Sequence, residues 1–367
     1  MFLADQSGVS PEWVMERMAC LPAECREQHF ILLTSGSTGK PKLVVGTRQR
    51  AESLARTLHE LQASEPVDET VCLLPLTYCY AFVNQWLWSR QFNRRLVVTE
   101  GLAQPGRLKE ALATSRNAMI CLVGAQVPLL TRYFQEDVFP GVIRVHFAGG
   151  RYPQERLDEV RRLFPNAEIF NNYGCAEAMP RLTLRRAEDA PLASHIGWPL
   201  PGVEMRADET DRLLFRSAYG AVAMIDDVGF TAIGPETWVP TGDLGRRLEN
   251  GQWELLGRAN EVFKRYGEKI SLPQILTLVR ANWHGLADCY RESDPQGEAG
   301  YVLVLSPAPS ADQVRDILRK LSQTLPRTHW PLRVEGVANL PMLANGKIDR
   351  QQLAGRPDST ILWRQRI

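Results

Sequence analysis

The chain has 367 residues, 44% of them hydrophobic, which is enough sequence for two or three domains with buried cores. It carries 43 Lys and Arg against 42 Asp and Glu, and this balanced charge argues against binding to nucleic acid or to a membrane surface. Its seven cysteines form no Cys-x-x-Cys pair, its six histidines show no metal-ligand spacing, and no signal peptide or membrane-spanning run is visible, so we expect a reduced, cytoplasmic protein.

Short apolar runs alternate with amphipathic segments from about residue 29 to residue 256. Such alternation is typical of βαβ units, so it predicts an α/β fold for a large N-terminal domain with mainly parallel sheets and helices. The predicted strands are His29–Leu33, Val71–Leu74, Leu96–Val98, Met119–Val123, Val142–Phe147 and Glu168–Asn171, and the predicted helices are Arg48–Leu61, Pro105–Ala113, Val127–Phe134 and Pro153–Phe164.

The pattern changes in the last third of the chain. Closely spaced strands with Gly and Asp turns between Leu213 and Leu256 predict a small antiparallel part of the large domain. After Gly257 the mixture of helices and strands predicts a small α+β domain of about a hundred residues. Its predicted helices are Leu272–Ala281 and Ala311–Thr324, and its predicted strands are Ala287–Arg291, Tyr301–Leu305 and Leu332–Val337.

A loop rich in glycines and hydroxyl groups lies between the first two apolar runs, at Leu33–Lys42. Glycines let backbone N–H groups turn toward an anion, and the hydroxyls and lysines add donors, so the loop suits a polyphosphate. It is not a Walker A loop, because only two residues separate Gly36 and Gly39 and Pro41 follows Lys40. On composition alone, a flexible hairpin loop explains it equally well.

The string Thr34–Lys42, TSGSTGKPK, resembles the phosphate loop of the adenylate-forming superfamily almost letter for letter. That family includes acyl- and aryl-CoA synthetases, firefly luciferases and the adenylation domains of nonribosomal peptide synthetases. Further motifs follow in the family's order as far as Arg350, so the resemblance covers nearly the whole chain. It implies that ATP phosphates are bound by Thr34, which is also catalytic, and by Ser35, Gly36, Ser37, Thr38, Gly39 and Lys40.

The string Asn171–Glu177, NNYGCAE, resembles the family's adenine and magnesium motif. The resemblance implies that Asn172, Tyr173 and Gly174 bind ATP, with Tyr173 stacked on the adenine, and that Glu177 holds Mg²⁺ and is catalytic. A carboxylate suits a hard cation that bridges phosphates. The family's usual Thr before this Glu is replaced by Ala176, which removes a hydroxyl near the α-phosphate. Taken alone, the string would be read as a turn.

Two shorter motifs add to the implied nucleotide site. Gly149 and Gly150, in the string AGGR, match a glycine pair that passes close to the adenine or the acyl group. Asp243, in the string TGDLG, matches the residue whose carboxylate accepts hydrogen bonds from the ribose hydroxyls. Each motif alone is a common turn. Both are significant here because they occur in the same order as in the family.

The string Gly257–Ser271 resembles the family's hinge and the start of its small domain. The alternative is a basic strand with a turn, and the length of the match argues against it. The resemblance implies that Arg258 contacts the ribose or a phosphate, that Asn260 replaces the common hinge Asp, and that Gly267 lies near the path of a phosphopantetheine thiol. We therefore expect a large domain at 1–256, a hinge at 257–262 and a small mobile domain at 263–367.

The string Asn345–Arg350, NGKIDR, matches the family's C-terminal motif, which makes Lys347 the adenylation lysine and an ATP ligand. A carboxylate that attacks an α-phosphate brings two anions together. A lysine ammonium placed between them offsets their repulsion where charge develops. A lone Asn-Gly pair would indicate only a hairpin turn.

The predicted acid pocket has one wall in Leu74–Asn84, with Tyr78, Tyr80 and Phe82, and others at Gly124, Ala148 and Gly149. Relatives that activate α-amino acids usually have an Asp in the first wall, and this segment contains none, so an amino acid is disfavoured. The aromatic side chains favour an aryl acid slightly, but they fit a plain hydrophobic core equally well.

The chain begins closer to its phosphate loop than most relatives do, with 33 residues before Thr34. We therefore expect a member shortened at its N-terminus. Apolar surface left uncovered by the shortening would be buried in a homodimer.

The resemblance implies ATP-dependent activation of a small carboxylic acid as an acyl-adenylate, followed by transfer to a phosphopantetheine thiol of CoA or of an acyl or aryl carrier protein. Two alternatives remain open. One is an adenylating ligase whose acceptor is an amine or a protein cysteine. The other is a degenerate nucleotide- or acyl-binding protein without catalysis, against which the intact Glu177, Asp243 and Lys347 argue.

Overall fold

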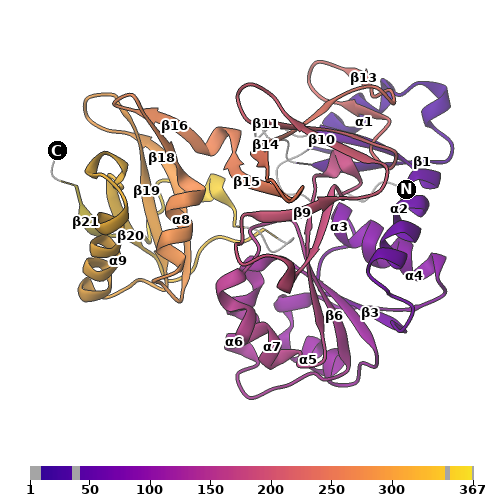
Figure 1. The fold of residues 1–367 in the computed structure, drawn as a ribbon, viewed down its shortest axis with the longest axis horizontal. Coiled ribbons are helices and arrows are strands. Elements are labelled where there is room, and N and C mark those ends of the chain that lie inside the picture. Colours follow the sequence, from indigo (N-terminus) through magenta and orange to yellow (C-terminus); the bar gives the residue numbers. More distant parts are fainter. Residues whose placement is uncertain (1–9, 35–41, 344–347, 366–367) are drawn as a thin grey trace. The chain divides into compact units, whose positions relative to one another are not determined.

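The computed structural model describes residues 10–34, 42–343 and 348–365 of the chain. They form two compact units, Met1–Leu255 and Leu256–Ile367, called the first unit and the second unit below (Figure 1).

The first unit is built on an 11-stranded mixed sheet with the order β10-β11-β14-β15-β9-β8-β7-β6-β5-β3-β4. The five strands from β4 to β7 in this order are parallel, whereas β8 is antiparallel to both β7 and β9. The parallel strands are β3 Glu69–Cys72, β4 Arg95–Val98, β5 Ala118–Leu122, β6 Val142–Phe147 and β7 Glu168–Tyr173. The others are β8 Thr183–Arg186, β9 His195–Pro199, β10 Val203–Ala207, β11 Arg212–Ser217, β14 Val239–Arg247 and β15 Trp253–Arg258.

Strands β5, β6 and β7 lie inside this sheet and are buried on both faces. On one face, Ile120 of β5 and Val145 of β6 pack against helices α5 Pro105–Ala113, α6 Val127–Tyr133 and α7 Leu157–Leu163 (Figure 1). On the opposite face, Met119 of β5 packs against Trp88 of helix α4 Trp88–Gln91. Successive side chains of a strand point to opposite faces, so burial on both sides produces the continuous apolar runs seen in the sequence.

Helix α2, Arg48–Leu61, begins where the hydroxyl of Thr47 accepts a hydrogen bond from the backbone N–H of Arg50 at 3.2 Å. Its buried side chains recur at helical spacing and give it one apolar face. Helix α2 contacts a second helical segment, which comprises α3 Cys79–Ala81, a π-helical stretch η2 at Phe82–Leu87, and α4. π-helical turns are rare and occur frequently at functional sites.

A smaller antiparallel sheet in the first unit has the order β1-β2-β12-β13, with β1 His29–Thr34, β2 Lys42–Thr47, β12 Ala223–Ile225 and β13 Phe230–Ala232. Helix α1, Pro11–Ala19, precedes it. The remaining short turns of 3₁₀ helix are η1 Ala23–Cys25, η3 Gly101–Ala103, η4 Gly124–Gln126, η5 Gln154–Arg156, η6 Ala176–Ala178 and η7 Ala187–Asp189.

The second unit contains a four-stranded sheet of β18 Leu286–Ser293, β19 Ala299–Ser306, β20 Arg333–Gly336 and β21 Thr360–Arg364. Helices α8 Leu272–Arg280 and α9 Ala311–Thr324 share one hydrophobic core with it. A separate hairpin pairs β16 Val262–Arg265 with β17 Glu268–Ser271. Short 3₁₀ turns lie at η8 Ala259–Glu261, η9 Arg327–His329 and η10 Arg350–Gln352.

The predicted α/β class is confirmed, and the helices predicted at Arg48–Leu61, Pro105–Ala113 and Ala311–Thr324 have those bounds in the structure. The antiparallel strands of the large sheet begin earlier than the sequence pattern indicated, at β8. The helical segment Cys79–Gln91 was not predicted either, because its aromatic and polar residues show no clean helical period. Within the described part of the chain, none of the helices is long and apolar enough to cross a bilayer.

The two-sided burial of β5 generates a stability prediction. Replacing the fully buried Ile120 by Ala should lower the free energy of unfolding by about 2–5 kcal/mol, because it removes buried methyl groups and leaves a cavity. Val228 is 94% exposed, so Val228→Ala should change it by less than about 0.5 kcal/mol. Urea unfolding of both variants checks this, and equal effects would contradict the proposed burial of β5.

Candidate active site

The glycine-rich string lies between two strands, β1 and β2, as the sequence predicted. The two strands form an antiparallel hairpin in which Thr34 pairs with Lys42, whereas the sequence pattern favoured parallel strands here. The predicted phosphate ligands Ser35, Gly36, Ser37, Thr38, Gly39 and Lys40 lie outside the described residues. Leu32 of β1 and Val44 of β2 share a hydrophobic cluster with Tyr173 and Ala176, so the hairpin packs directly against the second predicted motif.

Tyr173 and Asp243 meet although 70 residues separate them in the chain. Tyr173 ends β7, Asp243 lies in β14, and the phenol donates a hydrogen bond to Asp243 Oδ2 at 2.7 Å. Burial, with the nearby Asp243 carboxylate, raises the pKa of Tyr173 well above its ordinary value, so the phenol stays a neutral donor. Asp243 is itself held by Thr241, whose hydroxyl accepts from the Asp243 backbone N–H at 3.0 Å. The structure therefore joins an aromatic ring and a buried carboxylate.

The turn after β7 requires a glycine at position 174. A Cβ there would lie 2.0 Å from the carbonyl oxygen of Pro180, well inside any normal contact distance. The backbone then turns through η6, and the carbonyl of Glu177 accepts a hydrogen bond from the N–H of Ala221 at 2.8 Å. The NNYG string thus forms a strand end followed by a tight, packed turn.

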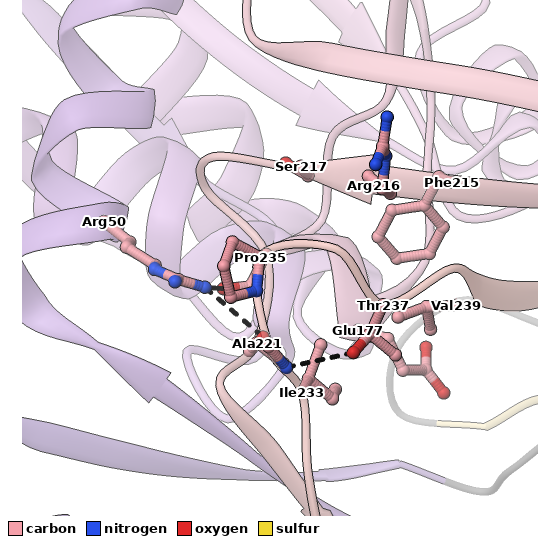
Figure 2. A pocket seen from close by; sticks show the side chains of 12 residues that line it. Arg50, Glu177, Phe215, Arg216, Ser217, Ala221, Ile233, Pro235, Thr237 and Val239 are labelled. Atoms are coloured by element: carbon pink, nitrogen blue, oxygen red, sulfur yellow. Dashed lines mark hydrogen bonds between the residues drawn. The ribbon is translucent and has the colours of Figure 1, made fainter.

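The Glu177 side chain lines a pocket formed by the turns after β7 and β11 and by helix α2 (Figure 2). On the far side of this pocket, Arg50 donates to the carbonyl oxygens of Gly220 at 3.0 Å and Ala221 at 3.5 Å. Since Arg50 is engaged by main-chain oxygens, it does not neutralise Glu177. Among the described residues the Glu177 carboxylate forms no ion pair, and the Cys175 side chain hydrogen-bonds with it.

The glycine pair after β6 lies where two strand ends pack closely. Gly149 has a φ of +77°, a conformation that favours glycine. A Cβ on Gly150 would lie 3.0 Å from Val123, and one on Gly124 would lie 2.1 Å from the carbonyl oxygen of Arg151. Both close approaches join the loop after β5 to the loop after β6, where the acid pocket is predicted.

Three of the predicted acid-pocket residues come together. Tyr80 and Ala148 belong to one hydrophobic cluster, and Tyr78 packs against it. Gly124 lies next to Ala125, which contacts the same cluster. Phe82 does not join them: its ring stacks on Trp86 with centroids 5.0 Å apart, in the cluster that includes Tyr173.

Asn172 is buried between β7 and helix α2. Its side-chain oxygen accepts a hydrogen bond from Gln62 at 3.2 Å, and its side-chain nitrogen donates to the carbonyl of Phe147 at 3.3 Å. These bonds tie the sheet to α2 beside Tyr173.

The remaining predicted site residues follow Leu255, the last residue of the first unit. Arg258 ends β15, and Gly267 with φ +82° and Tyr266 with φ +49° form the two-residue turn between β16 and β17. Arg350 of the C-terminal motif donates to both carboxylate oxygens of Asp288, at 2.8–3.1 Å, and also bonds Glu261. Lys347 and the side chain of Asn260 lie outside the described residues.

The sequence did not identify a group of buried polar side chains behind the acid pocket, at Gln62, Asn84, His146 and Arg181. These residues come from the C-terminal end of α2, from η2, from β6 and from the turn after η6, so no spacing along the chain links them. The one available signal was an arginine four residues after Glu177, in a segment otherwise apolar.

A family model described as AMP-binding enzyme matches residues 6–220, more than half of the chain. The delta-poly-L-ornithine synthetase of Acinetobacter baumannii strain AB307-0294 is 27% identical over 361 residues, an alignment that covers 91% of this chain and 26% of that protein. A D-alanine–D-alanyl carrier protein ligase from Bacillus licheniformis is 25% identical over 360 residues, with 88% of this chain and 70% of the ligase covered.

Among solved structures, the o-succinylbenzoate coenzyme A synthetase from Bacillus subtilis in complex with AMP superimposes with a TM-score of 0.71 at 19% identity. The superposition covers 90% of this chain and 69% of the synthetase, and at this identity it shows a shared fold. The chain thus spans about a quarter of the first curated relative and about two thirds of the synthetase.

The joined Tyr173 and Asp243 generate a binding prediction. Asp243→Ala should weaken ATP binding by about 1.5–3 kcal/mol, because hydrogen bonds from the ribose hydroxyls to a carboxylate are lost. Tyr173→Phe is the matched control, since it removes the phenol bond to Asp243 but keeps the ring and the carboxylate, and it should retain most of the affinity. Calorimetric titration with ATP measures both, and an Asp243→Ala variant with unchanged affinity would remove Asp243 from the nucleotide site.

Proposed function

Because the chain belongs to the AMP-binding enzyme family, we propose that it is an AMP-forming ligase of a small carboxylic acid. A carboxylate oxygen attacks the α-phosphorus of ATP, and pyrophosphate leaves with the cleaved bond's electrons. The resulting acyl-adenylate is then attacked by a thiol at its carbonyl carbon, which forms a thioester, releases AMP and frees the thiol proton. The observation that carries this proposal is the Tyr173–Asp243 pair, beside the hairpin whose loop suits a polyphosphate.

In the first half-reaction, each described residue has a role suited to its environment. Tyr173 offers an aromatic face to the adenine, and Asp243 is a buried acceptor for the ribose hydroxyls. Thr34, at the end of β1, begins the loop that holds the phosphates. Lys347 supplies the positive charge that offsets repulsion between the acid and the α-phosphate. Gly149 and Gly150 leave room for the acyl-adenylate, and Arg258 contacts the ribose or a phosphate.

Magnesium fits the donor set of this site. Mg²⁺ is usually held by one or two carboxylates together with substrate phosphates and waters, and Glu177 is one carboxylate without an ion pair among the described residues. When bound, Mg²⁺ would neutralise phosphate charge. No group of three or more metal-binding side chains occurs in the described part of the chain, which agrees with a cation held largely by ATP.

For the second half-reaction we propose a phosphopantetheine thiol as the acceptor. One curated relative is named as a ligase of a carrier protein, and a structural neighbour is named as a coenzyme A synthetase. The two units support a small domain that turns about a hinge near Asn260 and alternates between the half-reactions. Seven unpaired cysteines suit the cytoplasm, where this chemistry would take place.

The identity of the acid substrate depends on the residues that line the predicted acid pocket. Two curated relatives carry amino acids in their names, ornithine and D-alanine. This chain has no Asp in Leu74–Asn84 to bind an α-ammonium, and Tyr78 and Tyr80 share a cluster with Ala148. We therefore favour an acid without an α-ammonium, and an aryl acid over a long fatty acid.

Two other functions remain to be tested against this one. An amine or a protein cysteine in place of the pantetheine thiol would leave the first half-reaction unchanged. A degenerate binding protein would bind ATP without forming an adenylate, and Ala176 is the residue that supports it.

The proposal predicts acid-dependent exchange of pyrophosphate into ATP that requires Mg²⁺. A panel of aryl, aliphatic and amino acids identifies the substrate, and Glu177→Gln should lower the exchange rate strongly because the cation loses its protein ligand. A chain that binds ATP but shows no exchange with any acid would be the degenerate binding protein.

A second prediction separates the two half-reactions. Lys347→Ala should lower adenylate formation by roughly 10²–10³-fold and leave thiol transfer from supplied acyl-adenylate largely intact. Gly267→Leu should do the reverse, because a side chain would obstruct a pantetheine arm. The matched control is Gly297→Leu, since Gly297 has a similar φ of +87° and, like Gly267, has open space around an added Cβ.

Single-turnover rates of each step measure these effects. If Lys347→Ala slows both steps equally, Lys347 is a binding or structural residue. If Gly267→Leu and Gly297→Leu are alike, the acceptor reaches the adenylate by another path and an amine acceptor gains support.

A further inference from the structure

A cavity lies in the first unit between helix α2, the π-helical stretch η2, helix α4 and the face of β5 and β6 that these helices cover. It has room for about one water-sized group. Its walls include an unusual set of polar side chains for so deep a place, Gln62, Asn84, His146 and Arg181, beside Trp88 and Met119.

Arg181 is fully buried, and its charge is not compensated by the protein. Its Nε and Nη1 atoms have no hydrogen-bond partner, and no carboxylate forms an ion pair with it within the described ranges. The guanidinium lies over the ring of Tyr80, 4.7 Å from the ring centroid. A buried charge without a counter-charge is strongly destabilising, so this arrangement needs an explanation.

Two other fully buried arginines show how this chain stabilises such a side chain when its role is structural. Arg185 donates to five main-chain carbonyl oxygens, including that of His195 at 2.6 Å, and to the side chain of Gln154. Arg265 donates to two carbonyl oxygens and lies 3.6 Å from the carboxylate of Asp294. The Nε of Arg265 also has no partner, but its charge is compensated by Asp294. Arg181 differs from both, because two of its nitrogens have no partner and no carboxylate among the described residues forms an ion pair with it.

Arg181 acts on the pKa values of four buried groups, Cys79, Tyr80, Cys121 and His146, and the net shift of each favours the neutral form. Burial raises the pKa of Tyr80 well above its ordinary value and that of Cys121 to about 11. Burial also raises the pKa of the Cys79 thiol. The pKa of His146 is held well below its ordinary value by burial and by the charges of Arg181 and Arg144.

His146 adds a second unpartnered group to the same cavity. It is 1% exposed, and its Nε2 atom has no hydrogen-bond partner among the described residues. Its ring is fixed by stacking on Phe170, with centroids 5.0 Å apart. The cavity therefore presents both a fixed cation and a neutral imidazole to its occupant.

The predicted wall of the acid pocket contacts the side chains that line this cavity. Tyr80, a predicted wall of that pocket, supports Arg181 with its ring and donates to the carbonyl of His146 at 2.9 Å. Asn84 lies one helical turn after Tyr80 and donates to its carbonyl at 2.9 Å. Ala148, another predicted wall, follows His146 by two residues. Arg181, His146 and Asn84 are therefore all in contact with Tyr80, a predicted wall of the acid pocket.

We infer that Arg181, with His146, binds an anionic group at the far end of the acid, so that the substrate is a dicarboxylic acid whose second carboxylate reaches these two side chains. This inference rests on the proposed acid-activating function and names its substrate class. A carboxylate supplies the missing counter-charge and accepts charge-assisted hydrogen bonds from the unpartnered guanidinium nitrogens. The same cation disfavours acids that carry an ammonium group at that end.

Calorimetric binding of paired acids tests the inference without requiring catalysis. The probes are the linear dicarboxylates from malonate to suberate, each with the monocarboxylate of equal length, and isophthalate and terephthalate with benzoate. 4-(Aminomethyl)benzoate is the cationic counterpart of terephthalate. In the wild-type chain at least one dicarboxylate should bind about 10- to 100-fold more tightly than its monocarboxylate, and the cationic acid should bind least.

Arg181→Met should abolish this preference and leave the monocarboxylate affinity within about threefold. Arg181→Lys, which keeps the charge, should retain part of the preference. Arg185→Lys is the matched control, because it changes another fully buried arginine away from the cavity and should leave the preference unchanged. Thermal unfolding reports whether each variant is folded. If Arg181→Met does not fold, the wild-type preference for dicarboxylates over monocarboxylates still tests the inference.

Dicarboxylates that bind no more tightly than monocarboxylates would overturn the inference. The inference would also be overturned if chloride alone stabilised the wild-type protein against unfolding but did not stabilise Arg181→Met, because the cavity would then hold a structural anion. Pyrophosphate exchange on the same wild-type protein separates the two claims. If only monocarboxylates support exchange, the ligase function stands and the dicarboxylate substrate is wrong. If dicarboxylates bind in an Arg181-dependent manner but no acid supports exchange, the anion site stands and the ligase function is wrong.

Discussion

Burial of the central strands on both faces is the constraint on which the rest of the first unit depends. Strands β5, β6 and β7 are covered by α5, α6 and α7 on one side and by α2 and the helical segment Cys79–Gln91 on the other. With both faces packed, ligands can reach these strands only at their ends or in gaps between the sheet and its covering helices. Tyr173, the predicted adenine-binding residue, lies at the end of β7, and the polar cavity lies between the sheet and α2.

Much of this could be read from the sequence because local patterns carry it. The runs that form β5 and β6 are apolar and short, the apolar positions of α2 recur at helical spacing, and the string from Thr34 to Lys42 is distinctive in itself. The remainder depends on contacts between distant segments. Nothing in the sequence shows that the Tyr173 phenol meets Asp243, that Phe82 packs with Trp86 instead of with Tyr80, or that Arg181 lacks a partner, since each depends on how separate elements pack.

The contrast between Arg181 and Arg185 connects stability to function. The Arg185 guanidinium is surrounded by main-chain carbonyls and stabilises the loop that supplies them. A guanidinium with unpartnered nitrogens lowers the stability of the fold until a ligand accepts its hydrogen bonds. A buried polar group without a partner in a native protein needs an explanation, and a ligand that accepts its hydrogen bonds is one such explanation. In this chain the unpartnered guanidinium lies against Tyr80, which shares a hydrophobic cluster with Ala148.

The central claim is that a carboxylate of the substrate attacks the α-phosphorus of ATP. Its most direct test uses the acid that supports pyrophosphate exchange, labelled with ¹⁸O in its free carboxylate. The labelled acid is incubated with ATP, Mg²⁺ and a thiol acceptor, and the nucleotide product is analysed by mass spectrometry. Attack at the α-phosphorus predicts that one labelled oxygen passes from the acid to AMP when the thioester forms. Label recovered in inorganic phosphate together with ADP would mean attack at the γ-phosphorus and would contradict the account.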